Sequence, residues 1–79
     1  MSNTPHTLQQ EFPGEEARLS QLKGSDAHFA RLLEDYDTLN DQVHRAESRI
    51  DTMSEQAETD LRRRRSQVKD EIARLLRAA

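Results

Sequence analysis

Apolar residues recur at alternating steps of three and four positions between residues 29 and 53, and this is the clearest pattern in the chain. Such spacing keeps one face of a helix against a partner helix, as in the heptad seam of a coiled coil. It predicts a long helix over about residues 26–50. The members of this first seam are Phe29, Leu32, Tyr36, Leu39, Val43, Ala46, Ile50 and Met53.

A second seam, apolar except for Arg65, follows, and it is one residue out of phase with the first. A straight helix would have to absorb that slip, whereas a chain that turns within residues 51–54 would not. Thr52 and Ser54 are residue types that cap helices, so either can start a new helix. Neither glycine nor proline marks the turn, which leaves a continuous helix as the alternative. The second seam consists of Leu61, Arg65, Val68, Ile72 and Leu75.

The two seams can be tested as an antiparallel hairpin, because facing residues in such a hairpin have position numbers with a constant sum. The pairs formed here sum to 107 or 108, with the turn centred near Met53 and Ser54. This register favours a hairpin made of the long helix and a last helix over about residues 55–77. The pairs are Ile50 with Ala57, Ala46 with Leu61, Leu39 with Val68, Leu32 with Leu75, Val43 with Arg65, Tyr36 with Ile72 and Phe29 with Ala79.

A short helix over about residues 14–23 is expected before the hairpin. Proline, glycine and two acids occupy positions 13–16, a composition that suits a helix start because acids there complement the helix dipole. Gly24 is expected to end this helix in the left-handed conformation, with Ser25 or Asp26 as the next N-cap. A kinked continuous helix is the alternative.

Two parts of the chain are therefore distinguished. Residues 1–12 are expected to be a flexible or weakly helical N-terminus, with one helical turn around Leu8 to Phe12. Residues 13–79 are expected to form a single all-α helical-hairpin domain.

The composition limits how stable such a hairpin can be alone. The chain has 79 residues, of which 33% are hydrophobic, and it contains no cysteine. A scaffold this small usually needs a disulfide, a metal or a partner chain, and self-association is the means left open here. No signal peptide and no apolar stretch of about 20 residues is recognised, so a cytoplasmic protein without a membrane partner is expected.

The net charge of −3 hides an uneven distribution of charge. Residues 1–60 carry a balance of −8, and residues 61–79 carry +5. Blocks of opposite sign can be interaction tails or helices that attract each other. The hairpin explains the asymmetry, because it lays the acidic long helix along the basic last helix.

The predicted hairpin leaves the apolar residues of the N-terminal segment uncovered. That segment must fold back, stay mobile or pack on another chain, since isolated short helices are marginal in water. Pairs of helical hairpins commonly complete a four-helix bundle. The expected partner is therefore a protein, either a second copy in a homo-oligomer or another chain. The candidate partner-binding residues are Phe12, Leu19, Leu22, Leu33 and Leu76.

Five segments within about residues 7–76 form a further pattern. They are Phe12-Pro13, Leu22-Lys23, Asp26-x-His28-Phe29-x-x-Leu32, Tyr36-Asp37-x-Leu39-Asn40 and Arg65-x-x-Val68-Lys69-Asp70-Glu71-Ile72. In order and spacing they resemble the YdcH-like family of short bacterial proteins. Gly14 departs from the Phe-Pro-Glu of that family, which affects the expected capping of the first helix. The resemblance implies a bacterial, cytoplasmic helical hairpin and implies no reaction, because the function of the family is uncharacterised.

Four consecutive arginines at positions 62–65 are the most conspicuous charged run. Basic clusters can neutralise phosphates, which makes nucleic-acid association the alternative function, with Arg62, Arg63 and Arg64 as its candidate residues. However, successive helical residues lie about 100° apart, so four in a row cannot line one stripe. Arg65 belongs to the seam and is expected to pair with Glu47. Nucleic acid is the less favoured partner, because the chain is net acidic and lacks an aromatic platform.

The remaining candidates for chemistry are better explained by structure. The three histidines at positions 6, 28 and 44 are too scattered for a metal site, and His28 is expected to cap or pack at the bend. Ser66-x-x-Lys69 matches a serine-enzyme motif but lacks its accompanying motifs. Asp70 is placed for an ion pair with Arg74. We expect no catalytic residue, no cofactor and no metal, and hence a non-catalytic protein–protein interaction or regulatory module.

Overall fold

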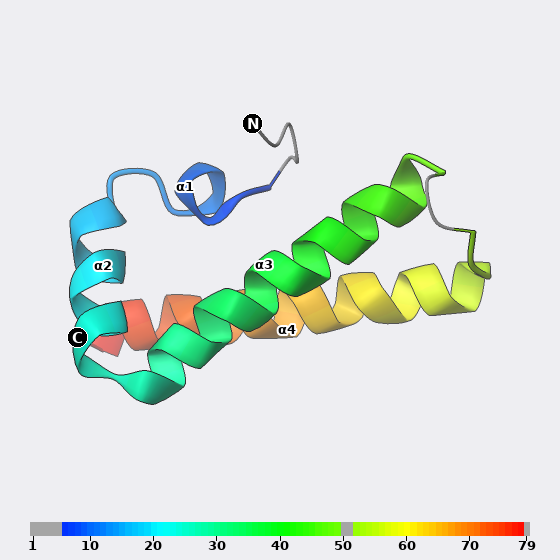
Figure 1. Ribbon diagram of the computed structural model, residues 1–79. Helices are drawn as coiled ribbons and strands as arrows, with labels where there is room; N and C mark the ends of the chain where they lie inside the picture. The colour runs from blue at the N-terminus through cyan, green and yellow to red at the C-terminus, as the bar shows by residue number, and fades with distance from the viewer. Residues whose placement is uncertain (1–5, 50–51, 79) are drawn as a thin grey trace.

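The computed structural model describes residues 6–49 and 52–78, and within them the chain is all-α with no strand. Two long helices form an antiparallel hairpin, and two short N-terminal helices pack on it (Figure 1). The predicted fold class is confirmed. No helix in this part of the chain is both long and apolar enough to cross a membrane. In chain order the helices are α1 (Leu8–Glu11), α2 (Glu16–Ser25), α3 (Ala27–Glu47) and α4 (Glu55–Ala78).

The connection between α3 and α4 begins earlier than expected. The long helix was predicted to reach residue 50, but it ends at Glu47, and Arg49 takes a left-handed φ of 62° that an α-helix cannot continue through. The middle of the connection therefore precedes the predicted centre at Met53 and Ser54. Ser54 is confirmed as a cap of α4, because its hydroxyl accepts a hydrogen bond of 3.1 Å from the amide of Ala57.

Contacts between the two long helices agree with the predicted register. Tyr36 and Ile72, a predicted pair, are 1% and 0% exposed and belong to one core cluster. The contacts of Glu47 with Arg62 and of Asn40 with Arg65 have position sums of 109 and 105, which bracket the predicted values. The predicted pairs of Ile50 with Ala57 and of Phe29 with Ala79 each include a residue outside the described part of the chain.

The buried stripe of α3 is rotated relative to the predicted seam. Leu33 and Asn40 are buried, whereas the expected seam residues Leu32 and Leu39 are only half-buried. The cause is that α3 packs on two sides, against α4 and against the N-terminal helices. The heptad pattern accounts for the α4 contact alone, because the second contact comes from elsewhere in the sequence.

The corner between α2 and α3 is built differently from the prediction. Gly24 lies inside α2 and does not cap it; instead Asp26 ends α2 and starts α3. The Asp26 carboxylate accepts hydrogen bonds of 2.9 Å and 3.2 Å from the amides of His28 and Phe29. Because one extended residue serves both helices, no left-handed glycine is needed there.

The start of α2 also differs from the prediction. Pro13 and Gly14 precede the helix, which begins at Glu16, and Gly14 takes a φ of +80° in the turn before it. A side chain at position 14 would be strained in that conformation. The turn redirects the chain from α1 into α2.

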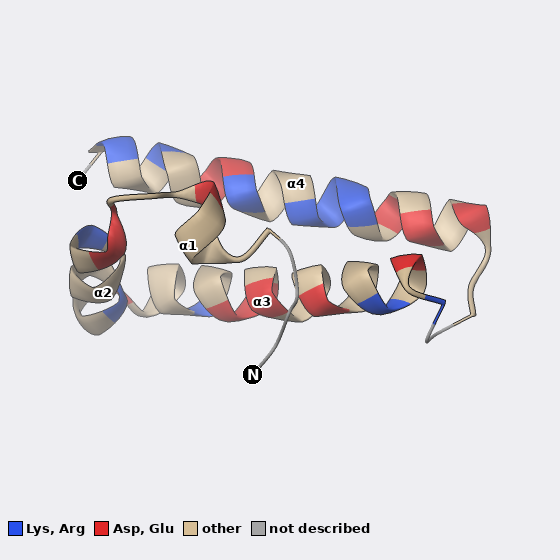
Figure 2. Ribbon diagram, turned by 90° about the horizontal axis from the view of Figure 1, so that it is seen from above, with Lys and Arg blue, Asp and Glu red and all other residues tan. Residues whose placement is uncertain are grey.

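The N-terminal segment was expected to fold back, stay mobile or pack on another chain. In the structure it folds back onto the hairpin. Leu19 is buried in the core cluster, and Leu8, Phe12 and Leu22 pack against that cluster. Helix α1 is a single turn capped by the hydroxyl of Thr7. From above, α1 lies over the groove between α3 and α4, while α2 crosses the end where α3 begins and α4 ends (Figure 2).

Candidate functional site

The hairpin has two faces, which differ in what packs on them. We call the side beneath α1 and α2 the covered face, and it contributes Leu33, Tyr36, Ile72 and Leu76 to the core. We call the opposite side the open face. On it, apolar residues of α3, α4 and their connection line shallow hollows to which neither α1 nor α2 contributes. A partner can reach the open face without displacing any described part of the chain.

The candidate partner-binding residues lie at the covered face, inside the molecule. Leu19 and Leu33 are each 7% exposed and Leu76 is 5% exposed. Phe12 and Leu22 are half-buried and pack against the same cluster. The structure therefore brings all five residues together, but as a core within one chain. Their role in partner binding stays a prediction, and it would require α1 and α2 to leave the hairpin.

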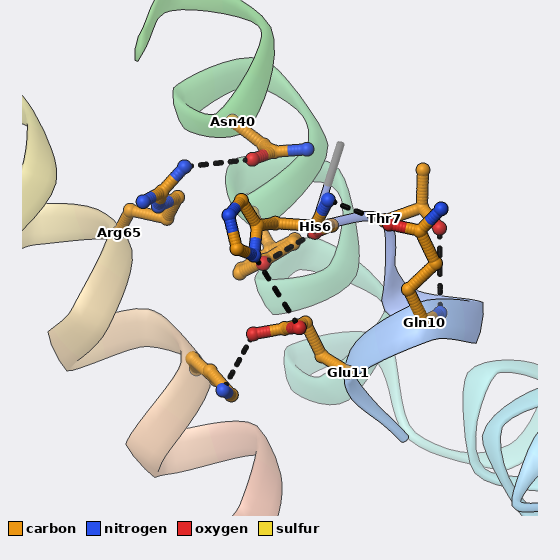
Figure 3. Close-up of polar contacts among 8 residues, drawn as sticks. His6, Thr7, Gln10, Glu11, Asn40 and Arg65 are labelled. Carbon is orange, nitrogen blue, oxygen red and sulfur yellow. Dashed lines mark hydrogen bonds and ion pairs between the residues drawn. The ribbon is translucent and has the colours of Figure 1, made fainter. Parts of the chain in front are cut away.

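Polar contacts hold the N-terminal segment over this core, and Figure 3 labels two of the residues that make them, His6 and Glu11. Together with Tyr36 and Lys69 we call them the clasp. The Glu11 carboxylate accepts a hydrogen bond of 2.6 Å from the Lys69 ammonium group, and its other oxygen lies 3.5 Å from His6 Nδ1. The Tyr36 hydroxyl donates to the His6 carbonyl at 2.6 Å. The clasp ties α1 to both long helices.

The clasp changes the acidity of two of its members. The hydrogen bond from Lys69 favours the charged form of Glu11 and lowers the pKa of that carboxyl. Burial raises the pKa of the Tyr36 hydroxyl, because an ionised phenol would lose its hydration. Sequence reasoning placed Lys69 on the helix surface and missed the clasp, since Glu11 and Lys69 lie 58 positions apart.

A further contact anchors α2 at the end of the hairpin. The Arg18 guanidinium donates a hydrogen bond to the carbonyl of Leu76 in the last turn of α4. Carbonyls in the last turn of a helix have no partner within the helix, and a cation there also complements the helix dipole. This contact adds a polar tie to the apolar packing of Leu19.

Arg65 has a different partner from the one predicted. Its guanidinium donates a hydrogen bond of 3.0 Å to the side-chain oxygen of Asn40, which is only 4% exposed (Figure 3). Glu47 instead contacts Arg62, one helical turn closer to the connection. The prediction was wrong because the heptad pattern gave no sign that Asn40 would be buried at this level of the hairpin.

The other three arginines of the run point in different directions, as the 100° helical step requires. Arg62 lies 3.2 Å from both Glu47 and Glu58, so acids already surround its charge. Arg63 is exposed, and Arg64 lines hollows of the open face. Within the described residues, neither Arg63 nor Arg64 forms an ion pair. The three candidate nucleic-acid residues are therefore not brought together into one basic stripe.

The open face carries a row of half-buried apolar residues with a charged edge. One hollow is lined by Met53, Ala57 and Leu61, and a second by Leu39 and Val68. Arg64 belongs to both hollows and so lies where they adjoin. Sequence analysis assigned these apolar residues to the seams, and the structure shows that α3 and α4 cover them only in part. Polar residues complete the lining of the hollows: Asp35, Thr38, Gln42, Asp60 and Gln67.

The remaining charged candidates lie on the surface. Within residues 6–49 and 52–78, no group of three or more His, Asp or Glu side chains is arranged to hold a metal ion. The ring of His28 lies 3.8 Å from Glu71, at the end of the hairpin opposite the connection. Arg74 pairs with Glu71 at 2.5 Å and not with Asp70 as predicted, because the partner three positions away is the closer one here.

The fold and its two faces define a class of small helical-hairpin proteins. Residues 29–76, more than half of the chain, match a family model described as a protein of unknown function (DUF465). The chain therefore belongs to the DUF465 family. The match spans nearly all of α3 and α4, and it leaves α1 and α2 outside. No curated protein and no solved structure matches the chain.

Proposed function

We propose that the protein is a non-catalytic interaction module that binds a protein partner on the open face of its hairpin. The observation that carries this proposal is the row of half-buried apolar residues along the groove between α3 and α4. Contiguous apolar patches rimmed by polar groups are typical of protein-binding surfaces. An amphipathic helix laid into such a groove would bury the row.

The open face supports this role better than the covered face does. Leu33, Ile72 and Leu76 belong to the same core cluster as Leu19 of α2. Binding there would first have to break the packing of that cluster. Leu39, Leu61 and Val68 retain exposed apolar surface that a partner can bury directly. Binding to the open face therefore has the lower cost in lost intramolecular packing.

We also infer that the chain is a bacterial, cytoplasmic protein of the YdcH-like kind. The support is the overlap between the matched family region and the segments that carry the resemblance, since residues 36–40 and 65–72 fall entirely within residues 29–76. The segments around Phe12 and Leu22 lie outside that region.

Nucleic-acid association through Arg62, Arg63 and Arg64 is the less favoured alternative. Phosphate binding needs several cations on one stripe, and here Arg62 is held by two glutamates. The alternative predicts DNA or RNA binding that falls steeply between about 50 and 200 mM salt and is lost when the three arginines are reversed in charge.

A photo-crosslinking amino acid tests the proposed function at single positions in cells. Placed at Leu39 or Leu61, it is expected to give adducts of higher mass that contain a second polypeptide. Placed at the exposed Asp70 of the same hairpin, it is expected to give none. Circular dichroism of each purified variant checks that the helices remain. Equal adducts from all three positions, or no adduct from Leu39 and Leu61, would contradict a partner on the open face.

A further inference from the structure

Arg64 and Asp60 carry opposite charges on the open face and do not pair with each other. They lie one helical turn apart on α4 and line the same hollow as the apolar side chain of Leu61. Asp60 accepts a hydrogen bond of 3.3 Å from the neutral amide of Gln56. Within the described residues, Arg64 makes no ion pair, not even with Asp60. Both signs of charge are therefore available to a partner at one place.

The order of these charges is self-complementary. When two copies of one helix cross in antiparallel directions, position 60 of each copy can face position 64 of the other. Each arginine then meets an aspartate, twice in one interface. A parallel crossing in register would instead place like charges together. In a twofold, isologous interface the same patch supplies both partners of every contact, and the antiparallel crossing lets it do so with opposite charges.

We propose that the partner on the open face is a second copy of this chain, with Arg64 of each copy paired to Asp60 of the other across a twofold axis. This inference rests on the proposed function and names its partner. Leu61 lies near the axis, and Ala57 is small enough to let the two α4 helices approach closely. Leu39 and Val68 become covered further along the groove, completing a four-helix core of the kind that paired hairpins form.

The dimensions of the hairpin are sufficient for such a dimer. The molecule is 38 Å long, and two adjacent helices present a face about 20 Å wide. A face of this size can bury the roughly 800 Å² per partner of a standard stable interface. A small core supports the need for a partner, since only eight hydrophobic residues are buried within residues 6–49 and 52–78.

Charge reversal at the two positions tests the proposal by sedimentation velocity on the full chain. Arg64→Asp leaves only acids at the crossing, and Asp60→Arg leaves only arginines. Each variant alone is expected to dimerise at least tenfold more weakly than the unmodified protein, because like charges then face each other. An equimolar mixture of the two, and the double variant Asp60→Arg with Arg64→Asp, are expected to recover dimerisation to within a few fold.

Arg63→Asp is the matched control for Arg64→Asp, because it makes the same change in net charge at an exposed neighbour that lines neither hollow. It is expected to dimerise like the unmodified protein, and circular dichroism checks the helicity of every variant. A monomer at several hundred micromolar unmodified protein would overturn the proposal. So would single variants that dimerise normally, or a mixture no better than its components. If the unmodified chain is monomeric but Leu61 crosslinks to other proteins, the proposed function stands and the second copy is excluded.

Discussion

The covered and open faces of the hairpin are made by the same two helices, yet they end up in different states. On the covered face, the N-terminal segment supplies Leu19 and Phe12, and the core beneath becomes nearly free of solvent. On the open face, Leu39 and Leu61 remain half-buried. A two-helix layer has two sides to cover, and the described residues cover one of them.

The two faces also differ in how their charges are used. At the covered face Glu11 and Lys69 are joined at 2.6 Å and tie the N-terminal segment down. At the open face Arg64 has no such partner among the described residues. On the covered face, the ion pair of Glu11 with Lys69 fixes the N-terminal segment in place. On the open face, the charge of Arg64 is accessible to another molecule.

The largest difference between the faces is expected from a buried charge. Ile72→Asp on the covered face should unfold the protein, since an ionised carboxylate at a position that is 0% exposed costs about 3–5 kcal/mol or more, including lost packing. Circular dichroism should show loss of most helicity. Leu61→Asp is the matched change on the open face and should keep the helices. Equal losses from both variants would remove the distinction between the faces.

Truncating Leu19 should have the next largest effect, because it joins α2 to the covered face. Leu19→Ala is expected to destabilise the protein by about 2–3 kcal/mol, measured by urea denaturation, since it leaves a cavity in the core cluster. Hydrogen exchange should accelerate in α2. A change below about 0.5 kcal/mol, the scale of surface substitutions, would show that Leu19 does not contribute to the core.

Removing the cap at the corner should have an intermediate effect. Asp26→Ala leaves the amides of His28 and Phe29 without their acceptor and is expected to cost about 1 kcal/mol in thermal or chemical denaturation. Asp26→Asn is the control, since asparagine also caps helices and should retain most of the stability. An alanine variant as stable as the asparagine variant would argue against the cap.

The smallest expected effect concerns the clasp. Glu11→Gln should cost less than about 1 kcal/mol, as partly exposed ion pairs do. Because the pKa of Glu11 is lowered in the folded state, its stabilisation is present above the unfolded pKa and is lost as the pH falls through the folded pKa. The difference in stability between the unmodified protein and the variant should therefore shrink at acidic pH. A difference that is constant from neutral to acidic pH would contradict the role of this carboxylate.

The local features of the fold follow from the sequence because they depend on near neighbours or on one periodic contact. The register of Tyr36 with Ile72 follows from the two seams, and the caps at Asp26 and Ser54 follow from residue type. Gly24 shows the limit of this reasoning, since a glycine was expected to end a helix that Asp26 ends instead. Residue type permits a helix to end at both positions, and it does not say which of the two is used.

The contacts between distant segments could not be predicted in the same way. Burial of Leu33 and Asn40 depends on where the N-terminal segment folds back, which no periodicity encodes. The clasp joins Glu11 and Lys69, which lie 58 positions apart. No spacing or motif in the sequence links these two positions. For the same reason the candidate partner surface was sought at Leu19 and Leu33, before the structure showed those residues packed within the chain.

Sedimentation equilibrium of the unmodified protein and of Leu61→Asp, combined with circular dichroism, tests the open face as a surface for a second copy most directly. The account predicts a dimer for the unmodified protein and a monomer of unchanged helicity for the variant. A helical monomer in both samples at several hundred micromolar, or a variant that still dimerises, would contradict it.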